Sequence, residues 1–247
     1  NRVVLDTRVR FDNPAEHFSD DPNLGDVTSE MTDEAMMGDI LKSSDDEITF
    51  TVDVHASAPI ERIDIRNGAE TVEVFRPYNE ADLGTRVRVL WEGSEYRGRG
   101  RETIWDGHAE FLGNSFARVE PINRFNQDKI FNPVDGRRLE WTAITTGGFG
   151  GFDAWLQDEE EGSIDIKTDL VSEEIKVSDI GRDELIFANG GIDRRIRIFR
   201  LPNENRHRAV KLERRLKLNA GRDNAYYVRI TQEDGHFIWS SPVYVFK

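Results

Sequence analysis

The feature that most constrains the fold is a period-two alternation of apolar and polar residues that recurs along the chain. Between residues 48 and 54, apolar side chains occupy every second position, and Thr or Asp occupies each position between them. Successive side chains of a β-strand point to opposite faces, so this pattern predicts a half-buried strand. Comparable patterns predict further strands around residues 87–91, 139–143, 164–166, 175–177, 196–198, 210–212 and 226–230.

Turn-forming residues divide these predicted strands. Asn67-Gly68 readily adopts positive φ angles and predicts a tight hairpin, and Asp234-Gly235 predicts a second hairpin that ends the chain. Pro242 cannot donate to a ladder, so we expect an edge strand or a bulge there. The one helix we expect is short and lies within residues 28–41, which begin with hydroxyl side chains suited to capping and continue with acidic residues.

The composition excludes several classes of protein. The 247 residues have a net charge of −14, which argues against a nucleic-acid partner, because binding a phosphate backbone requires a basic face. Cys is absent, which excludes disulfides, zinc–thiolate sites and cysteine nucleophiles. No apolar run reaches the length of a membrane-spanning helix, so we expect no membrane insertion. Compartment and oligomeric state stay open.

Residues able to perform catalysis are present but do not form a recognisable constellation. The five histidines occur singly, and acidic clusters such as Asp45-Asp46-Glu47 and residues 158–161 do not have calcium-loop spacing, so we interpret them as solvated loops. We therefore predict no catalytic residue, no metal site and no cofactor in this chain. A hydrolase whose histidine and carboxylates are brought together only by folding is the alternative.

The most unusual segment is Tyr96-Arg-Gly-Arg-Gly-Arg101. On an extended backbone Arg97, Arg99 and Arg101 would project to the same side, where their guanidinium groups could bind phosphate or carboxylate. Pairing with the chain's own carboxylates, or contact with a neighbouring domain, is the other interpretation. These three arginines are our candidates for an anion or domain contact.

Two further patterns have structural explanations. The five tryptophans could stack on sugar rings, but they occur within or beside apolar alternation, which is typical of core residues. The glycine-rich stretch at residues 145–151 lacks the Gly-Lys-Ser/Thr ending of a phosphate loop and is interpreted as a flexible or bulged turn. A carbohydrate-binding module predicts exposed, coplanar tryptophans on one sheet face.

Three long stretches resemble a known family. Residues 87–107, 145–149 and 227–242 resemble the C-terminal β region of a bacterial family of unknown function, and the resemblance covers the chain from about Met37 onward. In full-length members this region follows a domain similar to metal-dependent phosphoesterases of the polymerase-and-histidinol-phosphatase (PHP) type. The resemblance implies that any divalent metal belongs to that upstream domain, and it transfers no catalytic residue to this chain.

The resemblance also implies an architecture. We expect an all-β protein with little helix: an immunoglobulin-like sandwich formed by residues 46–84 and 206–247, and a second β domain inserted at residues 85–205. Residues 1–45 are predicted to form a leading strand and an acidic loop, with the short helix. The implied function is that of an accessory region that packs on an upstream catalytic domain of the same parent chain, or shapes access to it. The fragment alone is then not catalytic. A carbohydrate- or anion-binding sandwich module is the alternative function.

Overall fold

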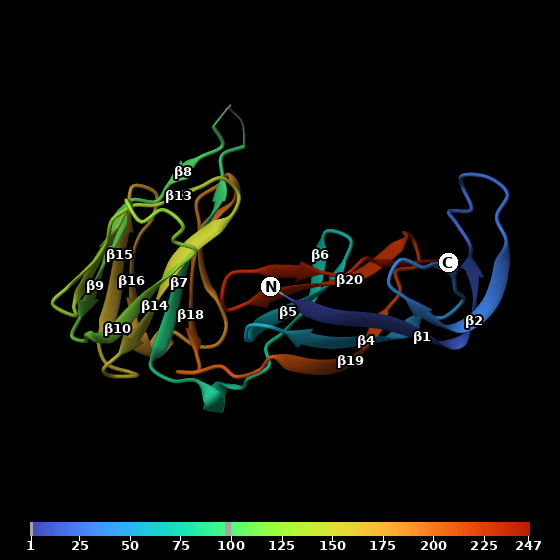
Figure 1. The fold of residues 1–247 in the computed structure, drawn as a ribbon, viewed down its shortest axis with the longest axis horizontal. Helices are drawn as coiled ribbons and strands as arrows, with labels where there is room; N and C mark the ends of the chain where they lie inside the picture. The colour runs from blue at the N-terminus through green and yellow to red at the C-terminus, as the bar shows by residue number, and fades with distance from the viewer. Residues whose placement is uncertain (1, 97–99) are drawn as a thin grey trace. The chain divides into compact units, whose positions relative to one another are not determined.

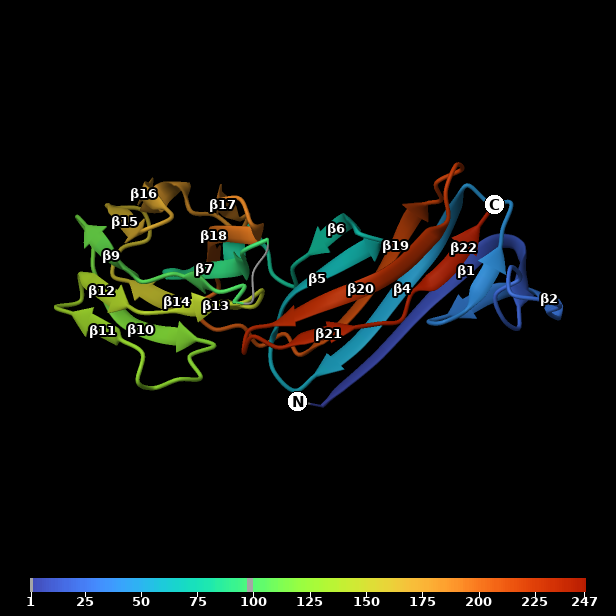
Figure 2. The same ribbon diagram turned by 90° about the horizontal axis from the view of Figure 1, so that it is seen from above.

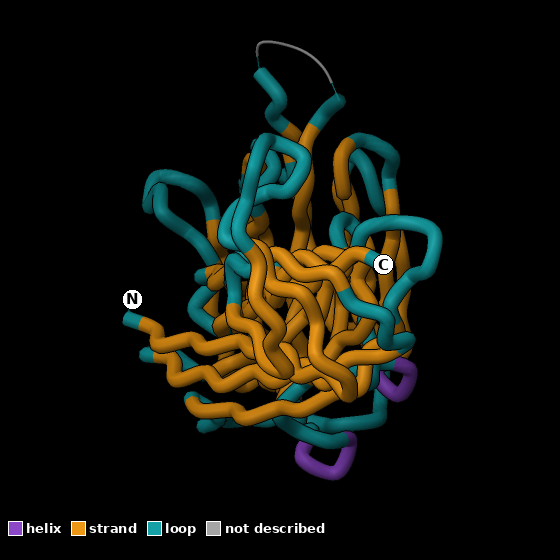
Figure 3. Tube along the Cα trace, turned by 90° about the vertical axis from the view of Figure 1, so that its right-hand side faces the viewer, coloured by secondary structure: helices purple, strands orange, loops and turns teal. Residues whose placement is uncertain are grey.

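The computed structural model describes residues 2–96 and 100–247, and these residues form an all-β protein, as predicted. Strands dominate the trace in Figure 3. The helical content in the described residues consists of two single turns of 3-10 helix, η1 at Glu80–Asp82 and η2 at Val177–Asp179. No described helix is long and apolar enough to cross a membrane.

The chain divides into two compact units, and the second is inserted into the first. Unit 1 comprises residues 1–77 and 206–247, and unit 2 comprises residues 78–205. Unit 2 begins at Tyr78 rather than at residue 85, because Tyr78 is buried beside Leu90 and Phe199 in a core of unit 2. The first 45 residues are part of unit 1, since their longest strand is paired within its sheet.

Unit 1 is one ten-stranded sheet that curls around its core (Figure 2). Arg214 of one terminal strand pairs with Glu73 of the other at 2.6 Å, so the two ends of the sheet meet. Two arms of the sheet thus face each other across a shared core, a sandwich-like arrangement. Its strands are β1 (Val3–Phe18), β2 (Ser29–Met36), β3 (Ile40–Lys42), β4 (Glu47–Ala56), β5 (Ile60–Asn67), β6 (Glu70–Phe75), β19 (Ala209–Lys217), β20 (Asn224–Gln232), β21 (Phe237–Trp239) and β22 (Val243–Phe246).

The helix predicted within residues 28–41 is wrong, because this segment forms β2 and β3. Both strands pair antiparallel with β1, and Gly38 between them has a φ of +102°. A short isolated helix is marginal in water, whereas the long β1 supplies backbone partners along its length. Inter-strand pairing therefore outweighs the local capping signal.

The predicted hairpins of unit 1 are present. β5 and β6 are joined at Gly68, which has a φ of +59° and thus needs no strained side chain. Pro242 interrupts the last strand and separates β21 from β22. β22 does not lie at an edge: it pairs parallel with β3 on one side and antiparallel with β20 on the other.

Unit 2 is a sandwich of two five-stranded sheets with a two-stranded ribbon (Figure 1). One sheet has the order β10-β14-β7-β18-β17 and the other β11-β12-β9-β15-β16, and their inner faces share one core. A smaller core covers the other face of the first sheet. The strands are β7 (Arg86–Ser94), β8 (Thr103–Ile104), β9 (Gly107–Leu112), β10 (Phe116–Ile122), β11 (Phe131–Val134), β12 (Arg138–Trp141), β13 (Ile144–Thr145), β14 (Phe149–Leu156), β15 (Ser163–Thr168), β16 (Ser172–Lys176), β17 (Leu185–Ala188) and β18 (Ile192–Leu201).

Candidate functional site

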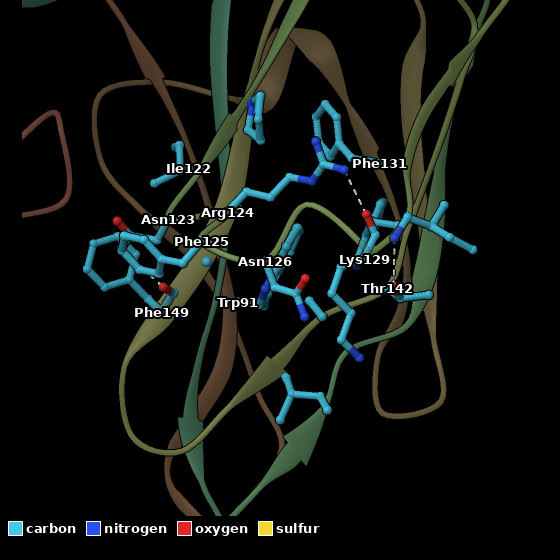
Figure 4. Close-up of a pocket in the computed structure, with 17 residues that line it drawn as sticks. Trp91, Ile122, Asn123, Arg124, Phe125, Asn126, Lys129, Phe131, Thr142 and Phe149 are labelled. Carbon is cyan, nitrogen blue, oxygen red and sulfur yellow. Dashed lines mark hydrogen bonds between the residues drawn. The ribbon is translucent and has the colours of Figure 1, made fainter.

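A cavity of about 290 Å³ lies within unit 2, beside the loop that joins β10 to β11 (Figure 4). The ends of β10 and β11, strands β7, β12, β13 and β14, and the segment between β12 and β13 contribute the rest of the wall. The lining residues are Trp91, Pro121, Ile122, Asn123, Arg124, Phe125, Asn126, Lys129, Ile130, Phe131, Trp141, Thr142, Ala143, Ile144, Phe149, Gly150 and Gly151.

Aromatic rings form the buried part of the cavity. The indoles of Trp91 and Trp141 are stacked, with centroids 5.0 Å apart and planes 7° from parallel, and Phe152 packs against both. The indole nitrogen of Trp141 donates to the carbonyl of Trp105 at 2.5 Å. A stack fixed in this way gives the cavity a rigid, apolar wall suited to a flat hydrophobic ligand.

Two glycines of β14 allow this wall to form. A Cβ at Gly150 would lie 2.8 Å from the indole nitrogen of Trp91, and a Cβ at Gly151 would lie 2.1 Å from the carbonyl oxygen of Val89. Both distances are too short for any side chain. The glycines thus permit β14 to approach β7 closely while keeping the cavity open.

The loop over the cavity, residues 123–130, is held in place by its own polar groups. Asn123 adopts a left-handed conformation, with a φ of 54°, and its side-chain amide donates to the carbonyl of Phe149 at 3.2 Å. The guanidinium of Arg124 donates to the carbonyls of Gln127 at 3.0 Å and Lys129 at 2.8 Å. Arg124 therefore fixes the loop as well as contributing a positive charge.

The charge of the lining is opposite to that of the whole chain. Arg124 and Lys129 line the cavity and no Asp or Glu does, although the chain has a net charge of −14. Neither cation forms an ion pair with any carboxylate in the described part of the chain. Their charges are therefore available to a ligand, and hydrogen bonds from an ionised donor are the stronger ones.

The predicted arginine strip is only partly visible. Arg97 and Arg99 lie outside the described residues, whereas Arg101 is described and exposed. Arg101 lies two residues before β8, where Ile104 pairs with Ile144 of the cavity lining. The segment therefore leads into a strand that neighbours the cavity wall.

The tryptophans do not form an exposed coplanar row. Trp91, Trp105 and Trp141 are buried in the core of unit 2, and the indole of Trp155 is contacted by the guanidinium of Arg118 at 3.9 Å. Trp239 is 54% exposed but belongs to unit 1. This distribution does not match a flat sugar-binding face.

The acidic clusters accept hydrogen bonds from backbone amides. Asp158 accepts from the backbone amides of Glu160 and Glu161, which lowers the pKa of Asp158, and Asp45 accepts from the backbone amides of Asp12 and Asn13. Across residues 2–96 and 100–247, no three His, Asp or Glu side chains are grouped so that they could hold a metal ion.

Sequence reasoning missed the loop of residues 123–130 because it has no strand or helix periodicity. Phe125, an aromatic residue in an otherwise polar segment, was the available signal. In the structure Phe125 is 89% exposed at the cavity. Phe125 therefore adds an exposed aromatic ring to the edge of the cavity, where a ligand could contact it.

No protein-family model matches the chain, and neither a curated protein nor a solved structure shows significant similarity to it.

Proposed function

We propose that this chain is a ligand-binding module whose inserted unit holds a small molecule with an apolar, aromatic body and an anionic group. The observation that carries the proposal is that, among the described residues, Arg124 and Lys129 form no ion pair and no carboxylate lines the aromatic-walled cavity beside them. The walls suit the apolar body, and the ammonium of Lys129, which extends away from the guanidinium of Arg124 (Figure 4), suits the anion.

The lining favours an apolar anion over a sugar. Sugar hydroxyls need both donors and acceptors, and carboxylates are efficient acceptors for them, yet none lines this cavity. Most of the lining is apolar, and a desolvated sugar hydroxyl beside it would lose hydrogen bonds to water. Between the two ligands of the predicted module, the anion is therefore the better match.

The accessory role beside a PHP-type phosphoesterase domain stays a prediction. A binding module of this kind is compatible with that role, because an inserted unit that binds an anion could place it near a neighbouring catalytic domain. The ligand-binding proposal does not depend on that neighbour, since every residue it uses lies in residues 78–205.

Two fluorescent probes with the same ring system test the proposal. 8-Anilinonaphthalene-1-sulfonate carries a sulfonate, and N-phenyl-1-naphthylamine is its neutral counterpart. We expect the anionic probe to bind the native protein, and Lys129→Gln to weaken that binding about tenfold, since loss of one charge-assisted contact is worth roughly 1.5 kcal/mol. The neutral probe should bind both proteins equally.

Lys176→Gln is the matched control. Lys176 is an exposed lysine of the same unit, on β16, and it does not line the cavity. Its replacement removes one positive charge without affecting the site, so both probes should bind as they do to the native protein. An equal loss of anionic-probe binding in the two variants would show that only net charge matters and would overturn the proposal.

A further inference from the structure

One polar group in the wall of the cavity is not used by the fold. Trp91 is only 4% exposed, and no described residue accepts a hydrogen bond from its indole N–H. The other tryptophans of unit 2 are all satisfied: Trp105 donates to Thr145, Trp141 to the carbonyl of Trp105, and Trp155 to the carbonyl of Asn203. The nitrogen of Trp91 is not one of the fully buried side-chain atoms without a partner in the described residues, so it is accessible, and an acceptor in the cavity could reach it.

The neighbouring backbone keeps the indole nitrogen of Trp91 approachable. Gly150 lies directly beside it, and the Cβ of any other residue there would come within 2.8 Å of the nitrogen. The same glycine lines the cavity. A side chain at residue 150 would therefore crowd the donor.

We infer that the ligand has two polar ends on one rigid apolar body. The anionic group binds the ammonium of Lys129, and an uncharged acceptor, such as a carbonyl or ether oxygen, takes the N–H of Trp91. The acceptor is uncharged because the indole stack and Phe152 would desolvate a second charge at high cost. This inference rests on the proposed function and narrows its ligand to aromatic acids that carry an oxygen substituent.

A matched pair of probes separates the acceptor from the shape of the ligand. 6-Methoxynaphthalene-2-sulfonate carries an ether oxygen, and 6-ethylnaphthalene-2-sulfonate has a methylene in its place. Each is titrated into the full chain labelled with ¹⁵N, and the indole N–H resonance of Trp91 is assigned as the one that Trp91→Phe removes. We expect the methoxy probe to move this proton downfield and to bind about fivefold more tightly than the ethyl probe.

Two variants keep the test decisive. Trp91→Phe removes the donor, and Gly150→Ala covers it, so each should abolish the preference for the methoxy probe. Lys129→Gln should weaken both probes equally and leave the preference intact, because it acts at the other end of the ligand.

The outcomes distinguish this inference from the proposed function. If both probes bind the native protein equally and shift the Trp91 resonance equally, the inference of an acceptor at Trp91 is overturned. The proposed anion site is then unaffected. If neither probe binds, both proposals fail. A preference that persists in Trp91→Phe would also overturn the inference, since another group would then be the donor.

Discussion

A single carboxylate in β14 forms ion pairs with two arginines in the interior of unit 2. Asp153 is 4% exposed, and it accepts from Arg86 at 2.6 Å and from Arg88 at 2.8 Å. Burial alone would raise the pKa of Asp153, but the two guanidinium groups outweigh it and hold the pKa below its usual range. The carboxylate is thus ionised at neutral pH and bound to both partners.

Replacing this carboxylate should destabilise the protein strongly. Asp153→Asn removes the ionised carboxylate that both buried guanidinium groups contact, and we expect a loss of roughly 3–5 kcal/mol in the free energy of unfolding at neutral pH. Urea denaturation measures it. Asp183→Asn is the control, because Asp183 has a 95% exposed side chain and a weak surface contact. Equal stability of the two variants would contradict the prediction.

The difference in stability between the native protein and Asp153→Asn should depend on pH, and the sign of this dependence can be predicted. A carboxylate with a depressed folded pKa stabilises the protein above the unfolded pKa, about 3.9 for Asp, and loses this effect as the pH falls through the folded value. The stability gap between native protein and Asp153→Asn should therefore narrow only below about pH 4. Urea midpoints between pH 7 and pH 2.5 test this, and a gap that narrows above pH 5 would exclude Asp153 as its origin.

Other buried arginines show what alternation cannot reveal about single residues. Arg195 and Arg197 alternate with apolar neighbours, as on a half-solvated strand, yet Arg197 is buried and pairs with Glu92 at 2.9 Å and Glu184 at 2.7 Å. Arg200 is buried as well, and it donates to backbone carbonyls that include that of Val177 at 2.7 Å. Partners distant in sequence decide whether a charge is buried.

At the scale of the strand, the pairing of β14 with β7 requires glycine at one position. We expect Gly151→Ala to cost roughly 1–3 kcal/mol or more, since its Cβ would meet the Val89 carbonyl at 2.1 Å and backbone cannot move aside cheaply. Gly148→Ala is the matched control, because a Cβ at Gly148 would meet nothing within 4 Å. Thermal unfolding compares them. Equal midpoints for the two variants would show that β14 can shift without cost.

Most strands could be predicted from the sequence, and the exceptions have a common cause. β4, β7, β18 and β20 contain the alternation that predicted them, and the β5–β6 turn follows from Asn67-Gly68. β2 was missed because its pairing with β1 is a long-range interaction that local signals do not report. The cavity was missed for the same reason: its wall combines Trp91, Trp141 and the loop of residues 123–130, which are separated in sequence.

At the scale of the whole molecule, net charge and local charge have opposite signs. A charge of −14 keeps the chain away from polyanions, as the composition indicates, but it does not describe the cavity, where Arg124 and Lys129 are the only charged residues of the lining described here. The composition therefore excludes large anionic partners and says nothing against a small anion. A small anion is repelled at long range by the net negative charge of the chain, so its binding should depend on short-range contacts in the cavity.

The division into units predicts that residues 78–205 fold by themselves. Two cores lie entirely within this range, and the cavity is built only from it. We expect the isolated unit to unfold in one cooperative thermal transition and to retain the Lys129-dependent binding of 8-anilinonaphthalene-1-sulfonate.

A fragment of residues 85–205 is the control, since it lacks Tyr78, which is 2% exposed in the smaller core. Loss of that side chain should cost roughly 3 kcal/mol, seen as a lower unfolding midpoint. If both fragments melt at the same temperature, the boundary lies at residue 85 after all; if neither shows a cooperative transition, unit 2 requires unit 1 to fold.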